Sequence, residues 1–294
     1  GYAMLGVMIS RVTGAPYWTF LRERLFDPAG MPTIRINTAT EIVPHRARGY
    51  MAGPAGLQNA SHVAEQTNTT ADGSMLFSLA DMIAWNEVVR TRTVLSPESW
   101  DQILTPMVLN SGNTHPYGFA WFFDDVAGQP VLEHSGTWQG FANQYTRFPS
   151  QDLSVIVLTN ARSTMSTSLA MRIGALIDQQ LKPEPPRTEA IADDPAVTAY
   201  VTDMLEKMSD GSLELADFDF VRQTVFPRMR AALQAQLDGR GRPDDLTLLA
   251  RKRVGDDTEL EYRATWGNRH MRVTLSIGPD GGLTNFVFLT PDPQ

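Results

Sequence analysis

The stretch of sequence that decides the fold is 133–141, which reads Glu-His-Ser-Gly-Thr-Trp-Gln-Gly-Phe. Its pattern is that of a strand edge ending in His-Ser-Gly, followed by a tight turn and then by a second strand-like run. Working outward from it, alternating apolar and polar residues predict antiparallel strands at 117–123, 130–135, 141–148 and 153–160. Because 153–158 is apolar on both faces, we expect it to sit in the middle of a sheet or to be covered twice.

Helical patterns flank these strands on both sides. Apolar residues between positions 5 and 12 fall at the i, i+3, i+4, i+7 spacing of an amphipathic helix, and Pro16 suits the first turn of another. Ser78 and Asp81 resemble a capping box that opens a third. A last helix is expected to carry the apolar residues from 169 to 181. Helices beside an antiparallel sheet predict an α+β fold.

A proline-rich acidic segment divides the chain. We expect domain 1–182, a linker at 183–195 and a second domain at 196–294. The second domain has two helical patterns, followed by strand patterns at 246–254, 260–266, 271–277 and 283–289. Two helices and a four-strand meander predict a small α+β domain that resembles the cystatin-like or nuclear-transport-factor-like folds.

Composition excludes several classes of function. The 294 residues carry a net charge of −8, which disfavours nucleic acid as the main partner. The chain has no cysteine, so disulfides, thiolate metal sites and thiol nucleophiles are ruled out. The histidines show no metal-ligand spacing, and we expect no metal and no other cofactor. No run of about 18 apolar residues is present, so no transmembrane segment is expected.

Several segments carry a family resemblance. They are His134-Ser135-Gly136, 1–6 (Gly-Tyr-Ala-Met-Leu-Gly), 14–31, 72–82 and 117–121 (Tyr-Gly-Phe-Ala-Trp). In this order they resemble the serine β-lactamase and penicillin-binding-protein superfamily, in the branch of class C β-lactamases, D-aminopeptidases and related esterases. The resemblance covers about residues 1–181. It implies a partial β-lactamase-like fold, with a helical subdomain, an antiparallel sheet and a closing helix.

The resemblance also implies two motifs that this sequence lacks. In that superfamily a Ser-x-x-Lys helix gives the nucleophile, and a Tyr-x-Asn loop helps to move its proton. The only lysines are Lys182, Lys207 and Lys252, and none lies three positions after a serine. Residues 1–6 match the segment that follows the Tyr-x-Asn loop in the family. We therefore expect both motifs to lie upstream of Gly1, in a missing N-terminal half of the same domain.

The resemblance assigns roles to the residues of 133–141. His134 takes the position where lactamases keep a lysine, so it would face the substrate as a donor or proton relay. Gly136 would let a substrate approach the strand, and the Thr137 N–H would be an oxyanion donor. Ser135 belongs to the same motif, but as a nucleophile with His134 as its base it is disfavoured, because strand neighbours point to opposite faces. Trp138 and Phe141 line the pocket or belong to the core; the sequence leaves both open.

Two functions follow as expectations. The first is a fragment of a serine hydrolase acting through an acyl-enzyme on an ester, amide or lactam of a small molecule or peptide. The histidine at position 134 makes an esterase or D-amino-acid peptidase more favoured than a true β-lactamase. The alternative is a non-catalytic protein that binds a ligand or peptide and keeps a vestigial hydrolase domain. The resemblance favours a periplasmic or secreted location. We expect the chain alone to be inactive, and poorly soluble without its missing half.

Overall fold

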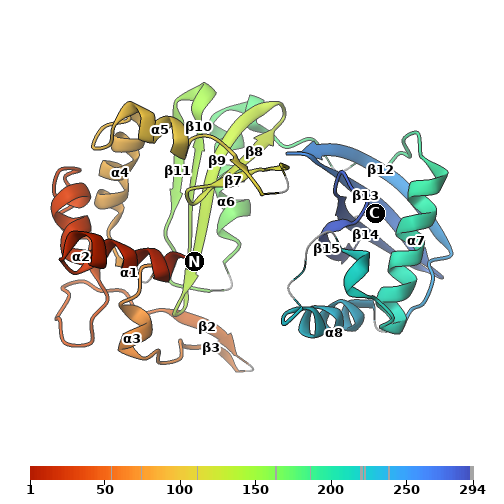
Figure 1. Ribbon diagram of the computed structural model, residues 1–294, viewed down its shortest axis with the longest axis horizontal. Coiled ribbons are helices and arrows are strands. Elements are labelled where there is room, and N and C mark those ends of the chain that lie inside the picture. Colours follow the sequence, from red (N-terminus) through yellow and green to blue (C-terminus); the bar gives the residue numbers. More distant parts are fainter. Residues whose placement is uncertain are drawn as a thin grey trace. The chain divides into compact units, whose positions relative to one another are not determined.

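The computed structural model describes residues 1–53, 55–73, 75–110, 112–162, 164–185, 187–218, 221, 223–237 and 239–291. The chain divides into two compact units. The first comprises Gly1–Pro106 and Tyr117–Glu184, and the second comprises Met107–Pro116 and Pro185–Gln294. The helices and antiparallel sheets drawn in Figure 1 confirm the α+β fold class.

The first unit has a helix in each segment predicted to be helical, although the segment 169–181 is divided into an α-helix and a 3₁₀ turn, and the short helix at 65–68 was not predicted. The helices are α1 (Tyr2–Thr13), α2 (Tyr17–Leu21) with the π-helical η1 (Arg22–Phe26), α3 (Glu65–Asn68), α4 (Leu79–Thr91), α5 (Pro97–Ile103), α6 (Ser166–Ile177) and the 3₁₀ turn η3 (Gln179–Leu181). The capping box is confirmed. The Ser78 side chain accepts from the Asp81 amide at 3.2 Å, and the Asp81 carboxylate accepts from the Ser78 amide at 2.8 Å. This reciprocal pair satisfies two amides at the start of α4, next to the site.

The main sheet of the first unit has the strand order β11-β10-β9-β8-β7, and every neighbouring pair is antiparallel. Its strands are β7 (Tyr117–Gly118), β8 (Trp121–Val126), β9 (Gln129–Trp138), β10 (Phe141–Phe148) and β11 (Leu153–Val157). Small strand pairs, β1 (Arg35–Ile36) with β4 (Met75–Leu76) and β2 (Tyr50–Gly53) with β3 (Gly56–Asn59), belong to the long excursion between α2 and α4.

Two strand predictions need correction. Of the two alternatives for 153–158, the position in the middle of the sheet is wrong, because β11 ends the strand order, whereas cover from two sides is found, because α4 and α6 both contact β11. The predicted strand 117–123 is broken into β7 and β8 by a tight turn at Phe119 and Ala120, whose φ angles are 48° and 65°. Residues other than glycine, asparagine and aspartate rarely adopt this left-handed conformation, so the sequence gives no turn signal there.

Each face of the sheet has its own core. On the α4 side, buried aromatic residues Trp100, Trp121 and Tyr145 pack with valines of α4. On the α6 side, Phe148 packs with Val155 and with residues of α6. A Cβ at Gly174 of α6 would meet the Phe148 ring at 2.8 Å, so glycine allows the helix to lie this close to the sheet.

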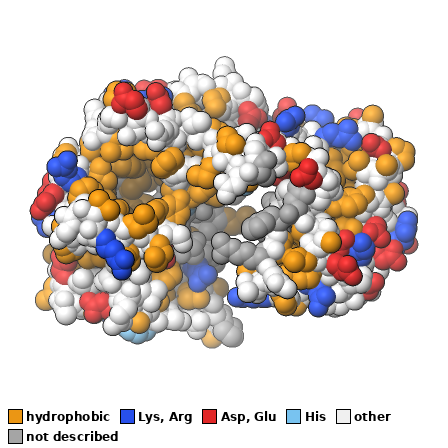
Figure 2. All heavy atoms as spheres, in the orientation of Figure 1, with side chains coloured by type: hydrophobic (Ala, Val, Ile, Leu, Met, Phe, Trp, Pro, Cys, Tyr) orange, Lys and Arg blue, Asp and Glu red, His pale blue; other side chains and the backbone are white. Residues whose placement is uncertain are grey.

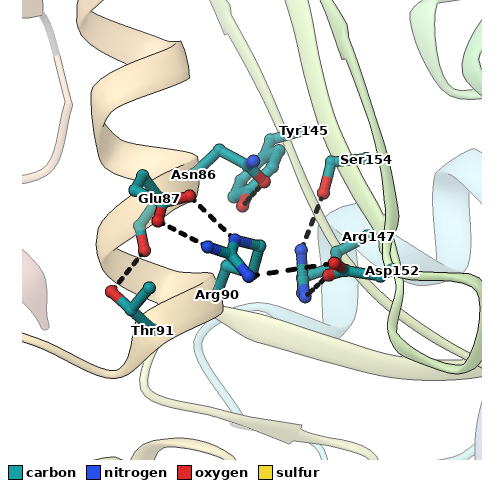
Figure 3. A network of polar contacts seen from close by, with 8 residues as sticks. All are labelled: Asn86, Glu87, Arg90, Thr91, Tyr145, Arg147, Asp152 and Ser154. Atoms are coloured by element: carbon teal, nitrogen blue, oxygen red, sulfur yellow. Dashed lines mark hydrogen bonds and ion pairs between the residues drawn. The ribbon is translucent and has the colours of Figure 1, made fainter.

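A polar network ties α4 to the ends of β10 and β11 (Figure 3). The nearly buried Arg147 guanidinium pairs with Asp152 at 2.8 Å and donates to the Ser154 hydroxyl at 3.2 Å. Arg90 of α4 binds Glu87 at 2.6 Å and approaches Asp152 at 3.9 Å. The Asp152 carboxylate therefore bridges the helix and the sheet.

Apolar surface remains open on the first unit. Side chains of α1 and α6 are among those most exposed, including Val12 at 85%, Leu176 at 79% and Ile177 at 63%. None of the helices in the described part of the chain is long and apolar enough to cross a membrane.

The second unit is built on another antiparallel meander. Its elements are α7 (Pro195–Asp210), the 3₁₀ turn η4 (Leu215–Asp217), α8 (Phe226–Leu237), β12 (Asp245–Val254), β13 (Asp257–Trp266), β14 (Arg269–Ile277) and β15 (Leu283–Pro291), with the strand order β12-β13-β14-β15. Leu205, Met208, Tyr262 and Val273 lie in its core. The hairpin of β5 (Met107–Val108) and β6 (Thr114–His115) groups with this unit although it lies far away in the sequence.

Part of the predicted linker is held against this meander. The Arg272 guanidinium donates to the Arg187 carbonyl at 2.8 Å, and Arg263 donates to the Thr188 carbonyl at 3.1 Å. The Ile191 amide donates to the Leu248 carbonyl at 3.0 Å. Residues 187–191 therefore follow the surface of the second unit.

Candidate active site

A cavity of about 600 Å³ opens in the first unit beside strands β9 and β10. All the predicted site residues line it: His134, Ser135, Gly136, Thr137, Trp138 and Phe141. Its other walls include Met82 of α4, the segment 75–77, and Arg46 and Asn37 of the long excursion. Figure 2 shows the hollow, with hydrophobic side chains gathered around it on the face beside α4.

The register of β9 with β10 fixes which side chains face this cavity. His134 lies opposite Tyr145, whose hydroxyl donates to Asn86 of α4 at 2.8 Å. Ser135 lies opposite Gln144, whose side-chain carbonyl accepts from Thr167 of α6 at 2.8 Å. Directly opposed residues share a face of the sheet and neighbours alternate, so the Ser135 side chain lies on the face away from His134. This geometry agrees with the argument against a Ser135–His134 pair.

Among the described residues, the pairing of β9 with β8 ends at Glu133, and His134 is the next residue of β9. Its Nδ1 is 2.7 Å from the Ser135 carbonyl oxygen, and its Nε2 is 3.3 Å from the Tyr117 hydroxyl. A carbonyl oxygen only accepts, so Nδ1 carries a proton; in the neutral ring Nε2 then accepts from Tyr117. The ring also stacks on Phe122, with centroids 5.5 Å apart. The imidazole is half-buried and oriented by three neighbours.

Two tyrosines extend this contact into a chain of hydroxyl groups. The hydroxyls of Tyr2 and Tyr117 are 2.9 Å apart, so hydrogen bonds link Tyr2 to Tyr117 and Tyr117 to His134. Burial, and then the hydrogen bond with Tyr2, raise the pKa of Tyr117 to about 12. Tyr117 therefore stays neutral at ordinary pH and can donate its proton toward Nε2. Neither tyrosine was singled out from the sequence, although both lie in segments that carried the family resemblance.

The Thr137 amide points away from β10. Its register partner Ala142 directs its own amide to the Thr159 carbonyl at 3.2 Å, on the β11 side. In an antiparallel ladder, such a pair exchanges no hydrogen bonds between its two strands, so the Thr137 N–H faces the other edge of β9. Among the described residues, the last pair between β8 and β9 is Phe122 with Glu133, so Thr137 lies beyond the part of β9 that pairs with β8.

Gly136 has open space around it. A Cβ built there meets no heavy atom within 4 Å. The lack of a side chain at this position is therefore not required by packing against any described neighbour. A glycine beside an unpaired strand edge permits close approach by another backbone or a ligand.

Residues of the long excursion pack against the turn between β9 and β10. Gln139 and Gly140 have φ angles of 43° and 86°, as in the two-residue hairpin turns that match the twist of the strands. The Gly49 backbone packs directly against this turn, because a Cβ at Gly49 would lie 1.9 Å from the Gln139 carbonyl oxygen. Asn37 donates to the Gln139 side-chain carbonyl at 3.2 Å. The long excursion thus holds the end of the site.

The remaining candidates have clear positions. Trp138, at 38% exposed, and the half-buried Phe141 both line the cavity. The exposed His45, Arg46 and Arg48 lie outside helices and strands, and Arg46 lines the cavity wall. In the parts of the chain that are described, no three His, Asp or Glu side chains are grouped closely enough to hold a metal ion.

Comparison with known proteins identifies the first unit. The family described as Beta-lactamase matches residues 1–177. The chain is 26% identical over 172 residues to penicillin-binding protein 4* of Bacillus subtilis (strain 168), covering 54% of this chain and 38% of that protein. It is 26% identical over 185 residues to the D-aminopeptidase of Gluconobacter oxydans (strain 621H), covering 62% of this chain and 34% of the relative. The chain therefore spans little more than a third of the length of these relatives.

A solved structure resembles both units. The octameric penicillin-binding protein homologue from Pyrococcus abyssi matches with a TM-score of 0.54 and 16% sequence identity. The match covers 95% of this chain and 60% of that one. At this identity the likeness concerns the fold alone.

Proposed function

Because this chain belongs to the β-lactamase family through residues 1–177, we propose that it forms one wall of the active site of a serine hydrolase acting through an acyl-enzyme. One observation carries the proposal. His134, whose Nε2 is 3.3 Å from the Tyr117 hydroxyl, and Thr137, three residues further along β9, both line the same cavity. Among the described residues, the Thr137 amide has no partner on β8. A carbonyl group bound along this part of β9 would meet a polar relay and an N–H donor together.

We assign the steps as follows. A serine hydroxyl from a segment outside residues 1–294 attacks the carbonyl carbon of the substrate. As the new C–O bond forms, negative charge develops on the carbonyl oxygen, and the Thr137 N–H stabilises it. Removal of one such donor typically costs about 3 kcal/mol of transition-state stabilisation. The bond to the leaving group then breaks, and the serine proton ends on the leaving oxygen or nitrogen.

His134 relays or donates a proton in this scheme. Its Nε2 lies at the end of the Tyr2–Tyr117 chain, so the ring is held with one nitrogen directed away from its own strand. The presence of an imidazole where lactamases keep a lysine favours an ester or a D-amino-acid amide over a lactam as the substrate. The relatives named D-aminopeptidase support that preference.

The missing catalytic motifs point to a second part of the same domain as the partner of this chain. The sequence contains no Ser-x-x-Lys and no Tyr-x-Asn. Among the described residues, the edge of β11 that faces away from β10 has no partner strand, and Leu176 and Ile177 of α6 are exposed. A further segment would cover both surfaces. We propose domain limits of 1–182 and 196–294, with the second domain in an accessory role. The boundary between the two units at Glu184 and Pro185 supports these limits.

The test compares residues 1–294 with the same protein extended by its upstream coding sequence. Each is treated with a fluorophosphonate that labels reactive serines, and hydrolysis is followed with p-nitrophenyl acetate, D-alanine p-nitroanilide and a chromogenic cephalosporin. We expect labelling and turnover in the extended protein alone, with the ester or the D-alanine anilide preferred. Labelling of a serine within 1–294 at comparable rates would overturn the assignment. Ligand binding by the extended protein without labelling would favour the non-catalytic alternative.

A further inference from the structure

Arg46 places a positive charge on the wall of a cavity that is otherwise mostly apolar. Apart from the titratable His134, only Arg46 and Asp72 are ionisable among the described residues that line it. Trp138 and Phe141 belong to its apolar walls. In pockets of this kind, the few polar groups determine how a small organic ligand is oriented. The charge of Arg46 is therefore a candidate for recognising one group of the ligand.

No described residue neutralises the Arg46 side chain. Three acidic residues of the long excursion are each bonded to another residue of the same segment: Glu41 to Arg35 at 2.7 Å, Glu65 to the Ala39 amide at 3.1 Å, and Asp72 to the Thr70 hydroxyl. Within the described part of the chain, Arg46 has no such bond. Its guanidinium is available to an anion, and its forked N–H groups match the two oxygens of a carboxylate.

The segment that carries Arg46 is attached to the turn between β9 and β10. The Gly49 backbone packs on the Gln139 carbonyl, and the Asn160 side chain donates to the Arg48 carbonyl at 3.0 Å. Consecutive Cα atoms are about 3.8 Å apart, so Arg46 cannot lie more than about 11 Å from Gly49. Arg46 is thus held near the turn end of the cavity.

Gln139 offers a second donor at this end. It is half-buried and lines the cavity. Its side-chain carbonyl accepts from Asn37 at 3.2 Å, and Asn37 is only 5% exposed, so the Gln139 amide is oriented from the interior. Because that bond uses the oxygen, the NH₂ group of Gln139 remains to donate to a ligand. An amide donor and a guanidinium together suit the oxygens of an anion.

The order of groups along β9 assigns this end of the cavity to the acyl part of a substrate. In the proposed function the Thr137 N–H binds the carbonyl oxygen, and His134, three residues earlier, lies on the leaving-group side. Gln139 follows Thr137 by two residues, so their Cα atoms are at most about 8 Å apart. The acyl group therefore extends toward Gln139 and Arg46.

We propose that Arg46 and Gln139 form a subsite for a carboxylate on the acyl group of the substrate. The assignment to the acyl group rests on the proposed function, whereas the binding of a carboxylate does not. The side chain of an acidic D-amino acid is one such group. A carboxylate and a carboxamide have the same shape and differ in charge, so D-glutamyl and D-glutaminyl compounds form a matched pair.

The experiment uses the extended protein and its Arg46→Gln and Arg46→Lys variants. Arg48→Gln is the matched control, because Arg48 is also exposed but is not among the described residues that line the cavity. One substrate pair is the α-p-nitroanilides of D-glutamate and D-glutamine. A second pair, the para-carboxyanilide and para-carbamoylanilide of D-alanine, has the charge on the leaving group. Ligand-observed NMR measures the binding of γ-acetylbutyrate and γ-acetylbutyramide, which are ketones without a bond to hydrolyse.

We expect Arg46→Gln to lower kcat/KM for the D-glutamyl anilide, relative to the D-glutaminyl anilide, about fivefold, as for an ion pair that water partly screens. Arg46→Lys should retain most of this preference, and Arg48→Gln all of it. The ratio within the second pair should not change in any variant. The preference for γ-acetylbutyrate over γ-acetylbutyramide should fall in Arg46→Gln alone.

Two results would overturn the subsite and leave the proposed function intact. One is an unchanged D-glutamyl to D-glutaminyl ratio in Arg46→Gln, and the other is a loss confined to the pair that is charged on the leaving group. Failure of the proposed function gives a different result. The protein would then react with neither the anilides nor the fluorophosphonate, and binding of γ-acetylbutyrate that depends on Arg46 would still support the carboxylate site.

Discussion

Replacement of Gly49 by alanine tests how the site is held in place. A Cβ at this position would lie 1.9 Å from the Gln139 carbonyl oxygen and 3.0 Å from Cα of Gly140. An ordinary contact begins at 3.4 Å, so the two backbones must separate by about 1.5 Å, from 3.4 − 1.9. Overpacking of this kind costs about 1–3 kcal/mol. Because the turn joins Trp138 to Phe141, the displacement reaches the residues that line the cavity.

The same displacement should also slow catalysis. A misplacement of about 1 Å in a catalytic group can lower a rate about 100-fold. We therefore expect Gly49→Ala in the extended enzyme to lose about two orders of magnitude in kcat, with the first unit still folded. For stability alone the control is Gly136→Ala, which meets no atom within 4 Å and should change the free energy of unfolding by less than about 1 kcal/mol.

The assay is hydrogen exchange of the β10 and α6 amides, which reports the stability of the first unit alone, together with backbone NMR shifts of 137–141. If Gly49→Ala leaves both within error of the unsubstituted protein, the close packing of Gly49 on the turn is wrong. If the shifts move and kcat does not, the turn has no part in positioning the site.

Three further predictions follow from the same geometry. Burial, and then the nearby Asp124 charge, raise the pKa of Glu133, so the folded state keeps the carboxyl proton to higher pH than the unfolded state does. The free energy of unfolding should therefore fall as pH rises from the ordinary carboxyl pKa through the raised one. Urea unfolding at a series of pH values should show a weaker pH dependence in Glu133→Gln, and an unchanged dependence would contradict the raised pKa. Tyr145→Phe should destabilise the first unit by about 1 kcal/mol, because it removes the 2.8 Å bond to Asn86; equal urea midpoints would show that this bond contributes nothing. Gly136→Ala in the extended enzyme should lower kcat/KM at least tenfold without loss of stability, and normal kinetics would remove Gly136 from the substrate path.

The elements of the first unit could be predicted where local chemistry determines them. The capping box of α4 and the strand 141–148 depend on short-range patterns, and the structure has both. The turn at Phe119 and Ala120 could not be predicted, because neither residue favours a positive φ; tertiary contacts must hold it. The apolar run 153–158 left two alternatives, a place in mid-sheet or cover from two sides, and only the structure decides for cover by α4 and α6, since an apolar run does not reveal which strands lie beside it.

The candidate site, like the fold, could be predicted only where short-range sequence patterns determine it. The His134-Ser135-Gly136 motif indicated the strand edge, and alternation along β9 correctly separated Ser135 from His134. The tyrosine chain was not predicted, because Tyr2 and Tyr117 are 115 residues apart and only the folded chain brings their hydroxyls to 2.9 Å.

The most direct test is a crystal structure of the extended protein trapped as an acyl adduct with a slowly hydrolysed ester. We predict the adduct's carbonyl oxygen within about 2.7–3.1 Å of the Thr137 nitrogen, with the His134 ring beside the leaving-group side and still in contact with Tyr117. An adduct bound elsewhere, or a Thr137 amide bonded to a protein carbonyl, would contradict the account.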